Sequence, residues 1–285
     1  MAECKSHHRW ILVFSLLIIC IIAQYQVATD ACGAAIQIRA TARLVTEPSG
    51  KVNVNYDIRN EGADPAYHVM VTTFLGMDAR KSEPYNELKG GASWSSYQCD
   101  FDLAGMIPGQ YILVSRISYD DQGGKQFAVY QLNPLSNRVD RLPDNKQALA
   151  LDITQPVVNA KSPLSASGKF GVSLTNNNRG PIRAVLNFYL PTGITVDEPE
   201  RFYDIGPGGA KSDDIDIKLT ASPAPGKYPY DAVVWYEFDG VHHARHVQKM
   251  VIVEEKPVLL IAFVALSVLV LAGVGGFIWW RRRKA

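Results

Sequence analysis

The chain has 285 residues, a formal net charge of +1 and an apolar fraction of 47%. This length suffices for about two domains, and the balanced charge excludes the strongly basic surface on which nucleic-acid-binding proteins depend. Neither value separates an enzyme from a binding protein, so function has to be sought in the pattern of residues along the chain.

The N-terminal segment has the pattern of a signal peptide. Basic residues between Lys5 and Arg9 precede an apolar run from Ile11 to Ala23. This run is short for a bilayer span, which takes about 20 residues. We therefore expect residues 1–34 to be a signal peptide or, because no clear Ala-x-Ala site follows, an uncleaved signal anchor. The region beyond it would be exported.

The exported region contains an internal duplication. Ser49-Gly50-Lys51-Val52 recurs as Ser167-Gly168-Lys169-Phe170, and an offset of 118 residues separates Ser49 from Ser167. The same offset relates Asn60 to Asn178, whereas Pro108-Gly109 and Pro225-Gly226 near the ends of the copies are 117 residues apart. Turn residues repeated in one register predict a copied domain. We place the two copies at residues 35–154 and 155–255.

Within each copy, alternating apolar and polar residues predict β-strands. From Val52 to Ile58 every second residue is apolar, which is the pattern of a strand with one face in water. Asp239-Gly240 suits a type I′ hairpin turn, because both central residues of that turn need a positive φ. Several short strands separated by turn signals predict an all-β fold of two tandem immunoglobulin-like β-sandwiches.

A Pro-Gly-x-Tyr element precedes the penultimate strand of each copy and ends at Tyr111 or Tyr228. It resembles a tyrosine corner, in which the phenol hydroxyl bonds to nearby backbone, so we expect a structural role. Together with Lys51–Gly62 and Lys169–Gly180, the element resembles the bacterial and archaeal immunoglobulin-like modules called CARDB and the NPCBM-associated domain of some glycosidases. The resemblance covers turn and core positions, so it implies a fold and leaves function open.

Near the C-terminus, residues 257–280 predict a transmembrane helix. Val258 to Trp280 contains no charged residue and would be about 35 Å long as a helix. The side chains expected to hold it at the membrane interface are Trp279, Trp280, Arg281, Arg282 and Arg283. Because basic clusters favour the cytoplasm, the tail at residues 281–285 would be cytoplasmic. The sequence thus predicts a single-pass cell-membrane protein whose duplicated domains are periplasmic or extracellular.

Few exported residues suit a metal or catalysis. His242 and His246 are weak metal candidates, since on a strand they would lie about 13 Å apart, while zinc–nitrogen bonds are about 2 Å. Asp213, Asp214 and Asp216 are calcium candidates, although Asp214 and Asp216 alternate with apolar residues as on an ordinary strand. The sequence has no nucleophile elbow and no His-Glu-x-x-His motif. We expect no catalytic residue and no cofactor.

Two cysteines and three aromatic residues complete the candidates. An oxidising compartment permits a disulfide between Cys32 and Cys99 if processing leaves Cys32 in place. Trp94, Trp235 and Tyr236 could stack on sugars. However, Trp235 and Tyr236 are neighbours on a predicted strand and would face opposite sides, so at least one is expected in the core.

These patterns favour a non-catalytic, membrane-anchored scaffold or protein-interaction subunit of the cell envelope. Its expected partner is another membrane or envelope protein, and nucleic acid is not an expected ligand. Two alternatives stay open. One is a carbohydrate-binding or adhesion module that takes a glycan. The other is a periplasmic chaperone-like protein, which would need an exposed edge strand able to accept a strand of its client.

Overall fold

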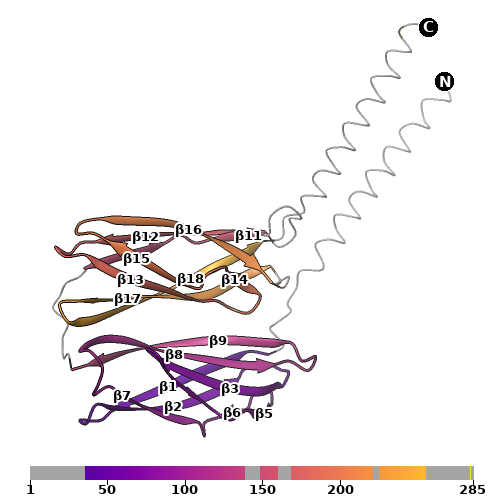
Figure 1. The fold of residues 1–285 in the computed structure, drawn as a ribbon. Coiled ribbons are helices and arrows are strands. Elements are labelled where there is room, and N and C mark those ends of the chain that lie inside the picture. Colours follow the sequence, from indigo (N-terminus) through magenta and orange to yellow (C-terminus); the bar gives the residue numbers. More distant parts are fainter. Residues whose placement is uncertain (1–35, 139–147, 160–167, 221–224, 255–282, 284–285) are drawn as a thin grey trace.

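The computed structural model describes residues 36–138, 148–159, 168–220, 225–254 and 283. These residues form two β-sandwiches that lie one against the other (Figure 1). Each sandwich has its own hydrophobic core, and the two cores share no residue. The predicted all-β fold of two immunoglobulin-like sandwiches is confirmed for this part of the chain.

The first sandwich consists of β1 to β9. One sheet contains β1 (Ile38–Thr46), β2 (Lys51–Asn60), β6 (Ser93–Trp94) and β7 (Gln98–Asp102). The facing sheet contains β4 (Asp78–Lys81), β5 (Tyr85–Leu88), β3 (Ala66–Leu75), β8 (Gly109–Asp120) and β9 (Gln126–Asn137). In β2 the predicted alternation holds, since Val52, Val54, Tyr56 and Ile58 are all buried between the sheets.

The second sandwich repeats this plan. One sheet has the order β10 (Leu149–Ile153), β12 (Lys169–Asn176), β16 (Ala210–Leu219), β14 (Ile194–Val196). The facing sheet has the order β15 (Glu200–Ile205), β13 (Ile182–Tyr189), β17 (Gly226–Phe238), β18 (Val241–Glu254), with β11 (Val157–Asn159) beside the end of β18. Asp239 and Gly240 join β17 to β18 with φ values of 51° and 71°. Both are positive, as the predicted turn requires.

The boundary between the sandwiches differs from the expected one. β10 pairs with β12, and Leu149, Leu151 and Ile153 lie in the second core. The second sandwich therefore begins before Leu149, one strand earlier than a boundary after residue 154. The sequence did not reveal this, because β10 lies before the repeated Ser-Gly-Lys motif by which the second copy was recognised.

The register of the duplication also differs, because Asn60 corresponds to Asn176 and not to Asn178. Asn60 Nδ2 donates to the carbonyls of Asp64 and Leu88, and its Oδ1 accepts from the Gly62 amide. Asn176 makes the same bonds to residues four ahead and two ahead, and it donates to Ile205 in place of Leu88. β12 has 8 residues where β2 has 10, and this difference shifts the register by two.

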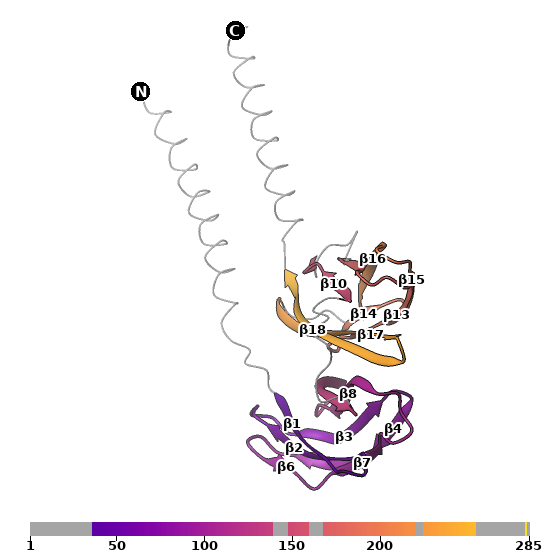
Figure 2. The same cartoon turned by 90° about the vertical axis from the view of Figure 1, so that its left-hand side faces the viewer.

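Both ends of the described body lie on the same side. Ile38 at the start of β1 pairs with Asn60, and Tyr67 pairs with Asp120 at the end of β8. β18 runs parallel to β8, so it ends on the side where β1 begins (Figure 2). We call this the proximal end and the opposite one, with the turn at residues 239–240, the distal end.

The membrane predictions fall elsewhere in the chain. Among the residues that the structure describes, none belongs to a helix long and apolar enough to cross a bilayer. The predicted leader at residues 1–34 and the predicted span at residues 257–280 lie outside those residues.

Candidate functional site: the junction between the sandwiches

The two sandwiches share main-chain contact at one point. β18 lies parallel to β8 with His242 beside Gly109, which joins strands of both domains into one sheet of ten. The His242 amide donates to the Pro108 carbonyl at 2.8 Å. A Cβ on Gly109 would lie 2.0 Å from the His242 carbonyl oxygen. Only glycine permits this approach, so the Pro-Gly-x-Tyr element of the first copy also shapes the junction.

The His242 side chain fills the junction beside this contact. Its ring stacks on Tyr111 with centroids 4.0 Å apart, and on Trp235 at 5.8 Å. Nδ1 lies 2.6 Å from the Gln110 carbonyl oxygen, and a bond to a carbonyl requires the proton on Nδ1. Burial lowers the pKa of His242 below its ordinary value of 6.5, so the site favours the neutral ring.

Apolar side chains continue the junction between the facing sheets. Val114 on β8, Val185 on β13 and Val233 on β17 are buried, yet they belong to neither core. A neighbour of each valine on its strand belongs to a core, so the valines point to the outer sides of the sheets. The strands β8 and β17 face each other (Figure 2). Burying a valine contributes about 1.5–3 kcal/mol, so these three side chains favour docking of the sandwiches.

A second set of contacts lies toward the proximal end. The Ala128 amide of β9 donates to Thr192 Oγ1 at 2.7 Å. The rings of Tyr130 and Tyr189 meet with centroids 5.4 Å apart, and burial raises the pKa of Tyr189 to about 12. With contacts at both its ends, the junction holds the sandwiches in one relative orientation.

The candidate metal ligands have other partners. His246 Nε2 lies 2.6 Å from Oδ1 of the buried Asp231, whereas His242 is held by Gln110. Asp213 accepts bonds from Arg201 and Tyr203, and Asp216 pairs with Lys169. Among the described residues, no group of three or more His, Cys, Asp and Glu could hold a metal ion.

Of the candidate sugar-binding aromatics, two lie in the cores. Trp94 is buried in the first core and Tyr236 in the second, which confirms that one member of the Trp235-Tyr236 pair packs inside. Trp235 is half-buried against His242. Tyr85, which the sequence analysis missed, is exposed and stacks on Trp94 with centroids 5.1 Å apart.

The remaining predicted residues divide between the described part and the rest of the chain. Tyr111 Oη donates to the Ile107 carbonyl at 2.6 Å, and Tyr228 is partly buried against the second core. Cys99 is a free, half-buried thiol in the described part, and burial raises its pKa. Its predicted partner Cys32 lies outside the described residues, as do Trp279, Trp280, Arg281 and Arg282, whereas Arg283 is described and exposed.

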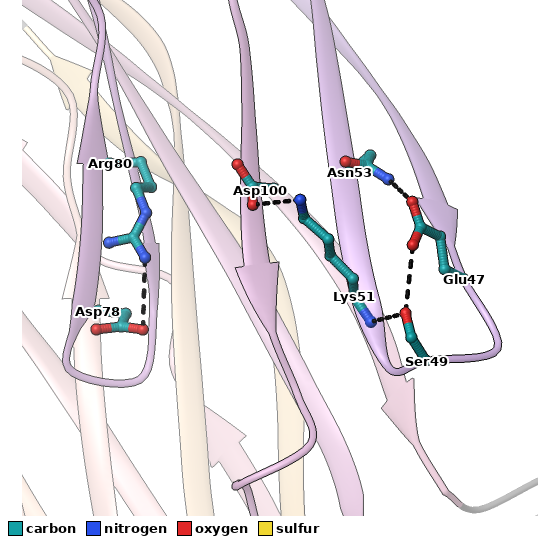
Figure 3. A network of polar contacts seen from close by, with 7 residues as sticks. All are labelled: Glu47, Ser49, Lys51, Asn53, Asp78, Arg80 and Asp100. Carbon is teal, nitrogen blue, oxygen red and sulfur yellow. Dashed lines mark hydrogen bonds and ion pairs between the residues drawn. The ribbon is translucent and has the colours of Figure 1, made fainter.

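A polar network lies at the distal end of the first sandwich (Figure 3). Lys51 Nζ is 2.9 Å from Asp100 Oδ2, and this pairing raises the pKa of Lys51 and lowers that of Asp100. Glu47 accepts bonds from Asn53 and Ser49, and Arg80 lies 3.9 Å from Asp78. Ion pairs this exposed add little stability, so we regard the network as a surface feature and not as a support of the fold.

The chain matches no family model and no curated protein sequence. Similar solved structures include the C-terminal part of native Escherichia coli alpha-2-macroglobulin, from domain MG7 onward, with 12% identity and a TM-score of 0.32 over 38% of this chain and 16% of that chain. Red sea bream transglutaminase has 13% identity and a TM-score of 0.27 over 81% and 33%. A Porphyromonas gingivalis W83 protein of unknown function has 14% identity and a TM-score of 0.31 over 77% and 100%.

These similarities are too low to bear on function. The chain spans 16% and 33% of the lengths of the macroglobulin and transglutaminase chains. The description of each sandwich as immunoglobulin-like therefore rests on its own strand order, and the resemblance to CARDB and NPCBM-associated modules stays a prediction.

Proposed function

We propose that the protein is a non-catalytic scaffold or interaction subunit of the cell envelope, held at the membrane by residues 257–280. The observation that supports this most is the junction, because His242, Gly109 and the buried valines fix the two sandwiches as one body. Such a body presents its surfaces to a partner in a constant arrangement, which lowers the entropy lost on binding.

The position of the described ends agrees with an anchored body. β1 begins and β18 ends at the proximal end, so both hydrophobic segments of the sequence connect to the body there. The distal end then points away from the membrane, with the partner in the periplasm or outside the cell.

Protease protection tests the orientation. We expect protease added to the outer side of spheroplasts to digest both sandwiches, and a tag after Ala285 to be cleaved only after permeabilisation. Digestion of the sandwiches from the cytoplasmic side alone would contradict the proposal.

Co-purification tests the interaction role. We expect the full chain, extracted in mild detergent, to co-purify with another envelope protein in a fixed ratio. This ratio should persist in 0.5 M salt, where the Debye length is about 4 Å and exposed charge pairs are screened. A chain that purifies alone under several mild detergents would leave the interaction role without support.

A carbohydrate-binding module is the second candidate, and one observation favours it. Tyr85 exposes its ring above Trp94, and a flat aromatic surface of this kind can stack on a sugar ring. If this role is correct, the exported part binds a glycan array and Tyr85→Ala abolishes the signal, whereas Phe202→Ala, at another exposed aromatic residue, preserves it.

A further inference from the structure

The distal end of the first sandwich carries an exposed apolar patch. We call it the distal tip and define it as the exposed Phe74, Met77 and Ile107 together with Met106, which is half-buried against the first core. Met77 lies in the two-residue turn between β3 and β4, since Leu75 pairs with Asp78, and its side chain is fully exposed. Met106 belongs to the loop before β8, and its Cε lies 3.8 Å from the place of a Cβ on Gly76. The turn and the loop therefore adjoin.

Fold stability does not explain why apolar side chains are exposed at this turn and loop. A tight turn favours Gly, Asn, Asp and Ser, yet Met77 follows Gly76 here and leaves its whole side chain in water. Single exposed apolar residues are normal on any surface. However, three of the eight exposed large hydrophobic residues of the described part, Phe74, Met77 and Ile107, belong to this one tip.

The polar network of Figure 3 borders the tip. Asp78 directly follows Met77, and the turn that carries Ser49 is bonded to the Met106 loop through Leu103 N and the Gly50 carbonyl. Lys51 pairs with Asp100 and Arg80 with Asp78. The Glu47 carboxylate accepts bonds from neutral side chains, so the network keeps one negative charge. An apolar centre with a polar border is the composition of a protein interface. The paired charges do not form the basic cluster that anionic lipid or nucleic acid would require.

The tip also continues the face with which the first sandwich contacts the second. Phe74 pairs in register with Val114, which is buried in the junction. Ile107 precedes Pro108, whose carbonyl accepts the His242 amide. Phe74 and Ile107 are thus the uncovered margin of the surface with which the first sandwich contacts the second, and they lie at the end away from residues 36 and 254.

We propose that the distal tip is the docking surface for another exported protein, which offers an apolar pocket to Met77 and no cluster of acidic side chains around it. The flexible thioether side chain of methionine suits insertion into such a pocket. This inference rests on the proposed function and adds to it the place of contact and the chemistry of the partner.

The test uses the full chain in its own membrane, with a photoreactive amino acid at position 77 and, in a parallel protein, at position 202. Phe202 is the matched control, because it is an exposed apolar residue on β15 of the second sandwich. After irradiation and mild extraction, crosslinked and co-purified proteins are quantified by mass spectrometry. The same quantification is made for Met77→Asp, Met77→Leu and Phe202→Asp. Hydrogen exchange of β3 and β8 checks that Met77→Asp leaves the sandwich folded.

The expected result is one envelope protein whose apolar residues are crosslinked to the photoreactive amino acid at position 77. Its recovery should fall at least about tenfold in Met77→Asp, as for an interface hot spot, and stay unchanged in Met77→Leu and Phe202→Asp. If a protein co-purifies in equal amount with the wild type and with Met77→Asp, docking at the distal tip is refuted while the interaction role stands. Crosslinks between copies of this chain alone, or to lipid alone, refute this partner, and a chain that captures no protein removes the proposed function as well.

Discussion

The two sandwiches share most of their strand order, although β4 pairs with β3 whereas β14 pairs with β16 of the opposite sheet, and they fill their cores with different chemistry. In the first, the Tyr56 hydroxyl bonds Thr73 Oγ1 at 2.6 Å and Ser115 Oγ at 2.7 Å, which links β2 to the facing sheet. In the second, the core centres on a cluster of Phe170, Phe188 and Tyr230, with ring centroids 4.8–6.5 Å apart. One core is thus fixed by a buried polar network and the other by aromatic packing.

The equivalent positions show what the duplication preserved. With Asn60 matched to Asn176, Tyr56 corresponds to Val172, and with Gly109 matched to Gly226, Tyr230 corresponds to Leu113. The asparagines that tie the turns kept equivalent bonds, whereas the buried tyrosine lies on different strands. The Tyr230 hydroxyl has no hydrogen-bond partner among the described residues, and burial raises its pKa. Turn anchoring was retained after duplication, while core chemistry diverged.

The largest effects are expected where the copies agree. Asn60→Ala and Asn176→Ala should each destabilise their own sandwich by about 3 kcal/mol, because each removes three or more hydrogen bonds worth about 1 kcal/mol apiece. Hydrogen exchange resolved by strand measures the two losses separately. Unequal losses, differing by more than about 1.5 kcal/mol, would break the equivalence of the two residues.

The next effect should separate the copies. Tyr56→Phe leaves the buried hydroxyls of Thr73 and Ser115 without their partner, so we expect a loss of about 1–3 kcal/mol. Tyr230→Phe removes a hydroxyl that has no partner, so we expect no loss, or a gain of up to about 1 kcal/mol. Exchange rates in β8 and β17 report the two outcomes. Equal destabilisation by both changes would contradict the contrast between the cores.

The smallest effect concerns the hairpin that differs in the two copies. Because Tyr119 stacks on Phe127 as Tyr236 does on His243, the counterpart of His242 is Gln126, which is exposed. His242 has a lowered pKa when buried in the junction, so the open form binds a proton more readily. Docking is therefore strongest above pH 6.5, the ordinary pKa, and weakens as the pH falls below it.

The groups that face His242 are Tyr111, Gln110, Trp235, His243 and Glu237. We expect the protection of the 242 amide, which is its exchange rate compared with the intrinsic rate at the same pH, to fall between pH 6.5 and 5 in the wild type. The matched variant His242→Phe keeps the stacking and should remove that loss of protection. A loss of equal size in the variant would assign the pH effect to another group.

Sequence predicted the local features and missed the contacts between domains. The alternation in β2 and the turn at Asp239-Gly240 follow from rules that act within a few residues. The register of Asn176 escaped because two residues are lost inside a strand, where no turn marks the change. The junction escaped because Val114, Val185 and Val233 read as ordinary strand residues, and their burial depends on another sandwich docking against them. From the sequence, His242 was likewise only a weak metal candidate on a strand.

Fixed docking of the sandwiches is the claim on which the rest depends, and spin-label distances test it most directly. Labels on exposed positions of each sandwich, such as Asp57 and Asp214, should give one narrow distance distribution in the wild type. Gly109→Val should broaden it, because a side chain there would overlap the His242 backbone, while hydrogen exchange shows both cores intact. A broad distribution in the wild type, or an unchanged narrow one in Gly109→Val, would contradict a junction locked at this contact.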